Sequence, residues 1–224
     1  MIDLHTHTLN SDGELLPTEL WRRAQVKGYR FLGLTDHVDA SNFAEVFARL
    51  KTAADSLNRI APPRVIPGLE FTHLPPELIR PLAAEARALG VPLIVIHGET
   101  LAEPVAPGTN RAALMADIDI LAHPGLITPE EAALAQKRGI FLELSARKGH
   151  GLANGHVARL ARQAGASLIV NTDSHGPGDL ITREQAERLA RGAGLDEVEV
   201  AALFAAAEAL ARRLAGLGEG RKEN

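Results

Sequence analysis

Two segments near opposite ends of the chain carry metal-binding side chains spaced by one residue. His5 and His7 follow the apolar segment 2–4, and Asp173 and His175 follow the apolar segment 166–170. On an extended chain, side chains two positions apart point to the same side. One such pair is also compatible with a capped turn, but its repetition at both ends of the chain favours metal ligation.

Histidine and carboxylate side chains also follow the other apolar segments. Six of the nine histidines stand where such a segment ends. A catalytic zinc ion takes about three protein ligands, so the candidate ligands are too many for one ion. They are His5, His7, Asp12, His37, Glu70, His97, His123, Asp173 and His175.

The types of these ligands limit the choice of metal. The chain has no cysteine, so His, Asp and Glu must hold any metal ion. Imidazole together with carboxylate suits zinc, manganese or iron. Because a bridging carboxylate lets neighbouring ions share a ligand, the sequence predicts a site for two or three divalent ions.

The ligands fall at the ends of predicted β-strands that alternate with helices. Capping residues at Thr128, Thr182 and Asp196 indicate helix starts, and Gly139 and Gly165 indicate helix ends. Apolar runs predict strands at 2–4, 31–34, 65–69, 93–96, 118–122, 140–144 and 168–170.

Strands separated by helices of about 10–15 residues are typical of βαβ units and a parallel sheet. Seven such strands could close a barrel whose active site lies at their carboxyl ends, and an open doubly wound sheet is the alternative. No linker or repeat interrupts the pattern, so we expect one α/β domain over residues 1–218. Its last helix is predicted at 197–215, ended by Gly216 and Gly218, with a charged, disordered tail at 219–224.

The composition is that of an ordinary globular protein. Hydrophobic residues make up 46% and charged residues 23% of the 224, which excludes a disordered chain. The formal net charge of −4 argues against a protein that coats nucleic acid by bulk charge. No segment resembles a signal peptide or reaches membrane-spanning length. We therefore expect a cytoplasmic protein with no membrane partner.

The motifs HTH, SDG, TDH, GLE, VIHG, LAHPG and TDSH, in this order between residues 5 and 175, resemble the PHP family, named for polymerase and histidinol phosphatase. Each motif alone is weak, but the ordered combination is specific. The resemblance implies that the domain 1–218 is a PHP domain with a distorted (β/α)7, TIM-like barrel. It also implies up to three metal ions and the hydrolysis of phosphate esters.

The resemblance assigns the nine ligands to three ions. The first ion would take His5, His7, Glu70 and Asp173. The second would take Glu70, His97 and His123, so that Glu70 bridges the pair. The third would take Asp12, His37 and His175, with Asp12 at a position where the family has either aspartate or histidine. Because all nine positions are filled, the resemblance argues against a degenerate, metal-free member.

Such a site fits hydrolysis of a phosphate ester. Two ions roughly 4 Å apart can activate a metal-bridging hydroxide and stabilise both the attacking and the leaving oxygen. Glu70 and His123 are therefore the predicted catalytic residues, because they build the site that holds the hydroxide. A third ion or an arginine would add positive charge near the phosphoryl oxygens.

The loop after the sixth predicted strand is rich in groups that bind phosphate. Arg147 can bind phosphate with two parallel hydrogen bonds, and Lys148 offers a point charge. His150, Asn154 and His156 are further candidate donors. The alternative is a solvated, glycine-rich turn with helix caps.

Two further segments supply candidate substrate residues. The loop after the fourth predicted strand is long, as functional loops often are, and contains Glu99, Glu103 and Arg111. The two glutamates are candidates to line the site, and Arg111 to reach the substrate. Arg183 is another candidate phosphate ligand, although a surface position on a helix is the simpler interpretation.

Other polar residues have structural interpretations. Asp3 and Asp36 could orient the rings of ligand histidines or form turn hydrogen bonds. His73, Trp21 and Glu143 are expected to be structural, with Glu143 as a buried acceptor behind a metal ligand.

Together these features predict a metal-dependent phosphoesterase, similar to histidinol phosphatase, that acts on a small phosphomonoester or nucleotide. One alternative is a nuclease acting on nucleic-acid ends. A second is a non-catalytic, PHP-like subunit that binds RNA. The complete ligand set favours catalysis, and the absence of a basic stripe disfavours both nucleic-acid functions.

Overall fold

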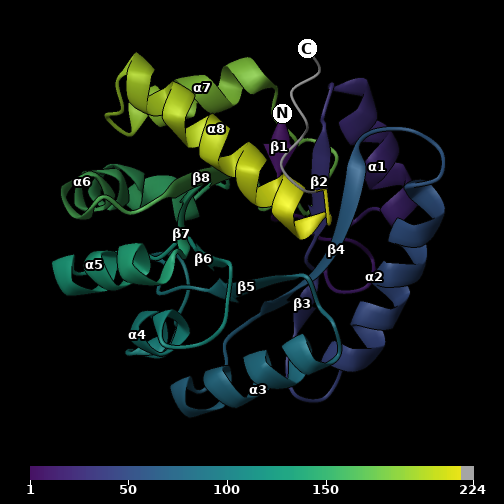
Figure 1. The fold of residues 1–224 in the computed structure, drawn as a ribbon, viewed down its shortest axis with the longest axis horizontal. Helices are drawn as coiled ribbons and strands as arrows, with labels where there is room; N and C mark the ends of the chain where they lie inside the picture. Colours follow the sequence, from purple (N-terminus) through teal and green to yellow (C-terminus); the bar gives the residue numbers. More distant parts are fainter. Residues whose placement is uncertain (218–224) are drawn as a thin grey trace.

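Parallel strands alternate with helices along most of the described chain (Figure 1). We describe a computed structural model that covers residues 1–217. The strands are β1 (Ile2–Asp3), β2 (Phe31–Leu34), β3 (His37–Val38), β4 (Arg64–Phe71), β5 (Leu93–His97), β6 (Ile120–Ala122), β7 (Phe141–Ser145) and β8 (Leu168–Asn171). The α-helices are α1 (Pro17–Val26), α2 (Phe43–Leu57), α3 (Pro76–Ala88), α4 (Thr109–Leu114), α5 (Pro129–Arg138), α6 (Asn154–Ala164), α7 (Arg183–Gly192) and α8 (Glu197–Leu214).

The strands form a nearly closed, TIM-like barrel. They pair in parallel in the order β1-β2-β4-β5-β6-β7-β8, and β3 pairs with β4. The chain segments that follow β1 and β8 close the ring. There Asp173 N donates to His5 O over 3.0 Å, and His7 N donates to Ser174 O over 2.8 Å. The predicted single-domain barrel is confirmed, and the open doubly wound sheet is wrong.

All seven predicted strands are present, β2 with the predicted bounds and the others with shifted ends. β1 and β6 are shorter than predicted, and β4 is longer. The two-residue strand β3 was not predicted, because two residues are too few to show an alternating pattern.

Side-chain alternation along the strands divides the barrel interior into two layers. Phe31, Ile66, Leu93, Ile120 and Ile169 point inward from the first half of their strands and form an apolar cluster. Four residues after Ile66 and Leu93, and two residues after Phe141, the same faces carry inward-pointing polar or ligand-type groups. These groups are Glu70, His97 and Glu143. The carboxyl half of the barrel is therefore the polar half.

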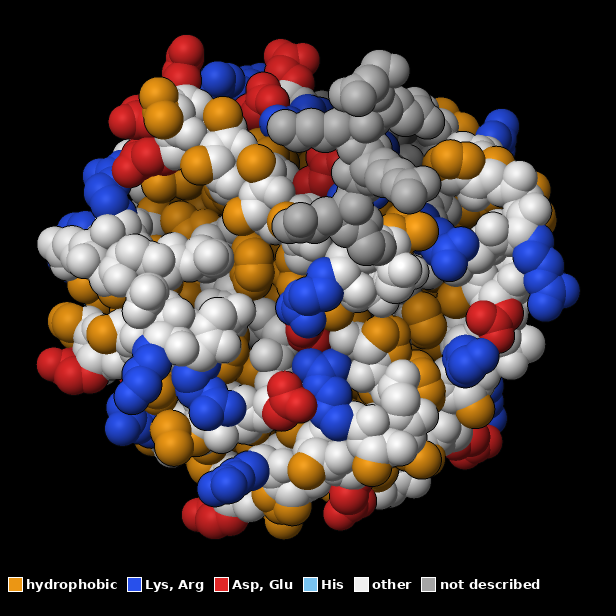
Figure 2. Space-filling model, in the orientation of Figure 1, with side chains coloured by type: hydrophobic (Ala, Val, Ile, Leu, Met, Phe, Trp, Pro, Cys, Tyr) orange, Lys and Arg blue, Asp and Glu red, His pale blue; other side chains and the backbone are white. Residues whose placement is uncertain are grey.

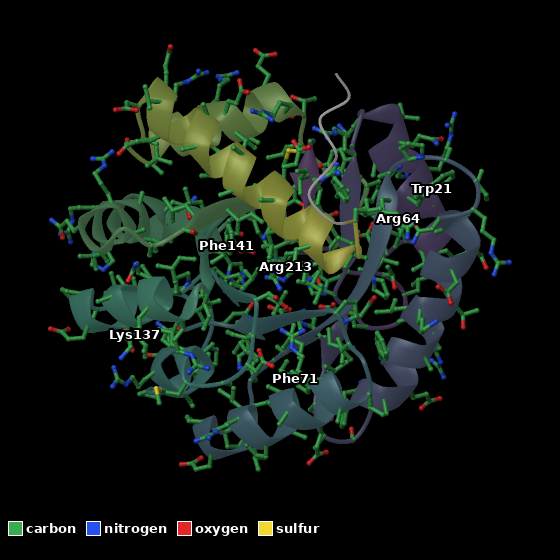
Figure 3. All side chains as sticks on the ribbon, viewed as in Figure 1. Trp21, Arg64, Phe71, Lys137, Phe141 and Arg213 are labelled. Atoms are coloured by element: carbon green, nitrogen blue, oxygen red, sulfur yellow. The ribbon has the colours of Figure 1, made fainter. Side chains whose placement is uncertain are left out.

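Helix α8 covers the amino end of the barrel, where it lies across the strands in Figure 1. Its residues Ala207, Leu210 and Ala211 belong to the apolar cluster of the barrel interior. Near the last turn of α8, Arg213 (labelled in Figure 3) donates to Asp119 Oδ1 over 3.2 Å. Asp119 also accepts from Arg87 of α3 over 2.7 Å. The side of the molecule that Figure 2 shows carries scattered charges of both signs among apolar side chains.

The predicted helix signals are confirmed. Capping boxes open α5, α7 and α8 at Thr128, Thr182 and Asp196. The left-handed Gly139 and Gly165 end α5 and α6, with φ of 68° and 72°. These turns need φ above zero, which glycine adopts without strain.

The end of the chain agrees with the prediction as far as the structure describes it. α8 ends at Leu214, one residue before the predicted end, and Gly216 follows with φ of 67°. Gly218 and the tail 219–224 lie outside the described residues. Within residues 1–217, no helix is both long and apolar enough to cross a membrane.

Candidate metal centre

The carboxyl ends of the strands bring all nine predicted ligands to one end of the barrel. Glu70 lies in the register of β4 beside His37 of β3 and Val95 of β5. His97 ends β5, and His123 directly follows β6. The closure of the ring between β1 and β8 adds the pair His5 and His7 and the pair Asp173 and His175, which the sequence separates by more than 160 residues.

The first predicted group forms a buried cluster. His5 Nε2 lies 3.2 Å from Glu70 Oε1, and His7 Nε2 lies 3.1 Å from Asp173 Oδ1. The other two distances are somewhat longer. His5 Nε2 lies 3.7 Å from Asp173 Oδ1, and His7 Nε2 lies 3.6 Å from Glu70 Oε2. These spacings suit four ligands that surround one ion.

The second predicted group shares Glu70 with the first. His123 Nε2 is 3.8 Å from Glu70 Oε1, and the rings of His97 and His123 lie 4.4 Å apart between centroids. One ligand atom from each of Glu70, His97 and His123 falls within a 4.8 Å group. Asp173 Oδ2 also lies 3.7 Å from His123 Nε2. Glu70 and Asp173 thus both stand between the two groups.

The third predicted group is open to solvent. Asp12 Oδ1 lies 3.2 Å from His175 Nε2 and 3.5 Å from His37 Nε2, and the Asp12 side chain is 59% exposed. The ring of His7 stacks at 4.1 Å on that of His175 and joins this group. The structure therefore places Asp12 with the two histidines that the family resemblance assigns to it.

The buried ligand atoms lack other partners. His5 Nε2, both nitrogens of His7, Glu70 Oε1 and Asp173 Oδ1 make no hydrogen bond within the described chain. Buried polar groups without partners cost roughly 1–3 kcal/mol each, and native proteins avoid them. Divalent cations would satisfy these atoms together, so the donor set fits the predicted metal ions.

The electrostatics of the cluster also suit cations. Burial, followed by the neighbouring His37, holds the pKa of His7 well below its usual value. Burial and His97 do the same to the pKa of His123. Both rings therefore stay neutral and can offer a lone pair to a metal. Burial raises the pKa of Asp173 to about 7 against the opposing effect of His5, and a cation would restore its charged form.

Glu143 orients His5 from behind, as predicted. Its Oε2 lies 2.8 Å from His5 Nδ1 and accepts from Asn171 Nδ2 over 2.9 Å. This contact places the N–H on Nδ1 and leaves Nε2 of His5 free toward the cluster. The structural expectation for Trp21 is confirmed as well, since its ring is buried and donates to Pro63 O.

The side chains of Asp3 and Asp36 accept hydrogen bonds that mostly join separate chain segments, and within residues 1–217 neither makes a hydrogen bond to the ring of a ligand histidine. Asp3 accepts from the backbone of His5 and from Thr172, and Asp36 accepts from Thr8 and Ser11. They fix the backbone of the segments that carry the ligands.

The backbone is strained at two predicted ligands. His123 has φ of 26° and Asp173 has φ of 51°. Positive φ is costly for residues other than glycine and concentrates at functional sites. The strain is consistent with two side chains that the fold aims at a common point.

Arg147 stands beside the cluster. It reaches His175 Nδ1 and donates to Asp173 O over 3.1 Å. It lines a cavity of about 220 Å³ over the ligands, together with the buried His150. A second, more open cavity of about 570 Å³ shares Arg147 and His175 and is also lined by Lys148. Three predicted substrate residues are therefore brought to the site.

Three of the other candidates, namely Asn154, His156 and Glu99, do not line either cavity in the part of the chain that the structure describes. Asn154 clamps the backbone of Ser145, and His156 lies 2.7 Å from Ile127 O. Glu99 accepts from the backbone of Gly108 and Asn110. These side chains bond to backbone atoms and hold chain segments in place.

Arg111 and Arg183 also lie away from the cavities. Arg111 is exposed on α4. Arg183 pairs with Glu187 and stacks on the ring of Phe204 at 3.5 Å. It lies near the Met1 amine, where it helps lower the pKa of that amine after the larger effect of burial. Arg183 thus belongs to the amino end of the barrel, so the simpler interpretation of a surface helix arginine fits.

One residue of the rim was misjudged from the sequence. His73 was expected to be structural, but it lines the cavity and lies 2.9 Å from Glu103 Oε2. Its position three residues after Glu70 was the available signal, since it also follows a strand. Glu103 lines the cavity as predicted.

Several known proteins resemble this chain in sequence or in fold. No family model matches the chain. An uncharacterized protein of Methanocaldococcus jannaschii is 45% identical over 200 residues, 88% of this chain and 92% of that protein. A probable phosphatase of Thermoanaerobacter is 25% identical over 218 residues, 88% of each chain.

Two solved structures share the fold. A chain of archaeal ribonuclease P with mature tRNA has a TM-score of 0.69 at 17% identity, over 99% of this chain and 94% of that one. Histidinol phosphate phosphatase of Lactococcus lactis, complexed with zinc, L-histidinol and phosphate, has a TM-score of 0.58 at 15% identity. That match covers 87% of this chain and 94% of the phosphatase.

The phosphatase relative, the shared barrel and the seven ordered motifs agree on one assignment. The chain belongs to the PHP family. For this PHP protein, the comparisons support a phosphatase-like hydrolase in general terms, and the ligand clusters support binding of divalent metal.

Proposed function

We propose that the protein is a metal-dependent phosphoesterase that hydrolyses a small phosphomonoester or nucleotide. The observation that carries the proposal is the convergence of unpartnered, buried nitrogen and oxygen atoms beside Arg147. Such atoms require cations, and the arginine offers the fork of donors that phosphate accepts. A structural cluster of histidines would need neither an open cavity nor an adjacent arginine.

Two or three ions of zinc, manganese or iron would occupy the nine-ligand set. His5, His7, Glu70 and Asp173 would hold the first, Glu70, His97 and His123 the second, and Asp12, His37 and His175 the third. When bound, they would supply Lewis acidity and lower the pKa of a coordinated water.

The residues of the chain have separate tasks in this scheme. Arg147 binds two phosphoryl oxygens and neutralises charge that develops on them. Glu143 holds the N–H of His5 so that the opposite nitrogen faces inward. The cavity of about 220 Å³ accommodates the phosphoryl group, and the open cavity beyond Arg147 accommodates the leaving group.

A combined metal and substrate assay tests the proposal. Elemental analysis of protein expressed in metal-replete medium should find two or three divalent ions per chain. A panel of phosphomonoesters that includes histidinol phosphate and nucleotides, with dinucleotides and single-stranded oligonucleotides beside them, should show fastest turnover on a monoester. Fewer than one ion per chain would contradict the proposal. Turnover restricted to oligonucleotides would favour the nuclease, and RNA binding without turnover the non-catalytic subunit.

A further inference from the structure

Glu103 lies among three imidazoles, although the nine-ligand set does not include it. Its Oε2 is 2.9 Å from His73 Nε2 and 3.1 Å from His97 Nε2. Its Oε1 is 3.4 Å from His150 Nε2. Glu103, His73 and His97 form one of the groups whose ligand atoms lie within 4.8 Å of one another.

The loop that carries Glu103 is fastened at both ends. Glu99 Oε1 accepts from Gly108 N over 3.0 Å and from Asn110 N over 2.9 Å. Asn110 Oδ1 in turn accepts from Glu99 N. The loop between β5 and α4 therefore holds Glu103 over the cavity instead of leaving it free in solvent.

The surroundings of Glu103 point to a cation. Ligand atoms about 2.0–2.2 Å from one ion lie roughly 3.0–3.5 Å from one another, and the separations of Glu103 from its three histidines are close to this range. His150 is buried, lines the same cavity, and its Nδ1 has no hydrogen-bond partner within residues 1–217. A carboxylate and several neutral imidazoles are a typical donor set for zinc, manganese or iron.

We propose that Glu103 and His73 are additional ligands of the ion that His97 holds. The inference rests on the proposed function, because it requires that ion to bind. His97 Nε2 faces Glu103, so the carboxylate can enter the same coordination sphere from the solvent side. Occupancy of this ion then also fixes the β5–α4 loop as one wall of the substrate cavity.

Metal titration separates this role from hydrogen bonding alone. Chelator-treated wild type, Glu103→Gln and His73→Asn are titrated with Mn²⁺ and with Zn²⁺ by calorimetry. Cobalt-loaded samples are compared by their visible absorption, which reports the ligands of the ion. Glu184→Gln is the matched control, because it removes the same charge from an exposed position on α7.

We expect Glu103→Gln to weaken the binding of one ion by roughly tenfold or more and to change the cobalt spectrum. His73→Asn should show smaller changes in the same direction. The control should match wild type. Wild-type affinities and an unchanged spectrum in Glu103→Gln would overturn the inference and leave the proposed function intact. Absence of any bound ion in wild type would overturn both.

Discussion

Glu70 contacts histidines of all three groups of the candidate site. It contacts His5 through Oε1 and His37 Nδ1 through Oε2, at 3.2 and 2.7 Å. Burial raises the pKa of Glu70, but His5 and His37 outweigh burial and hold it well below its usual value. The carboxylate is therefore charged and can bridge two cations.

We expect Glu70→Gln and His123→Ala each to abolish hydrolysis while the fold persists. Glutamine keeps the shape of Glu70 but loses the charge, and alanine removes a ligand nitrogen from the second group. Initial rates at saturating metal, with far-ultraviolet circular dichroism as the folding control, test this. Near-normal turnover in either variant would rule out the two-metal interpretation.

Variants of Arg147 test substrate binding separately from metal binding, because this residue is not one of the predicted metal ligands. We expect Arg147→Ala to lower kcat/KM by roughly tenfold or more, since hydrogen bonds to charged groups contribute about 1.5–3 kcal/mol. Arg147→Lys should recover only part of the loss, because lysine keeps the charge but not the paired geometry. The ion content of both variants, measured by elemental analysis, should equal that of wild type. An alanine variant as active as wild type would remove Arg147 from the substrate site.

At the scale of elements, the packing of the loop after β5 against the loop after β6 depends on a close approach between their backbones. Gly125, two residues after His123, has φ of 58°, and a Cβ placed on it would lie 1.9 Å from Glu99 O. Neither the contact nor the backbone conformation admits a side chain without movement. The two loops can thus pack only because this residue is glycine.

Gly125→Ala should therefore displace the β6–α5 loop and disturb His123. We expect a lower melting temperature and weaker metal binding together. Gly139→Ala is the matched control, because Gly139 has a similar φ of 68° and no atom lies within 4 Å of the position that a Cβ would take there. The control should lose stability but keep its metal affinity. Equal metal affinities in the two variants would show that the loop contact does not support the site.

At the scale of the whole molecule, α8 seals the end of the barrel opposite the ligands. Leu210 is buried against the interior cluster, whereas Val198 on the same helix is 78% exposed. We expect Leu210→Ala to cost about 2–5 kcal/mol and to lower the melting temperature by roughly 5–20 °C. Val198→Ala should change it little.

The variants Leu210→Ala and Val198→Ala also test whether the amino end of the barrel influences the ligand end. Below its melting temperature, Leu210→Ala should keep wild-type turnover and ion content, because the lost contacts lie among the first residues of the strands. A calorimetric scan and a rate measurement on each variant suffice. A loss of turnover at full folding would show that the α8 seal also shapes the site.

The sequence by itself determined the features that depend on neighbours along the chain. The spacing of His5 and His7, the capping boxes at Thr128 and Thr182, and the ends of helices at Gly139 follow from local geometry. The position of each ligand motif after a predicted strand also predicted that the ligands lie together, because parallel strands bring their carboxyl ends to one edge.

Only the tertiary structure decided which side chains meet across elements. Arg183 stacks on Phe204, a residue of another helix, and so lies away from the site. His73 and Glu103 come together from two different loops at the rim. Such contacts depend on how the ring closes and how loops pack, and no spacing within one segment specifies them. The same packing places α8 over the apolar end of the barrel and leaves the ligand end open.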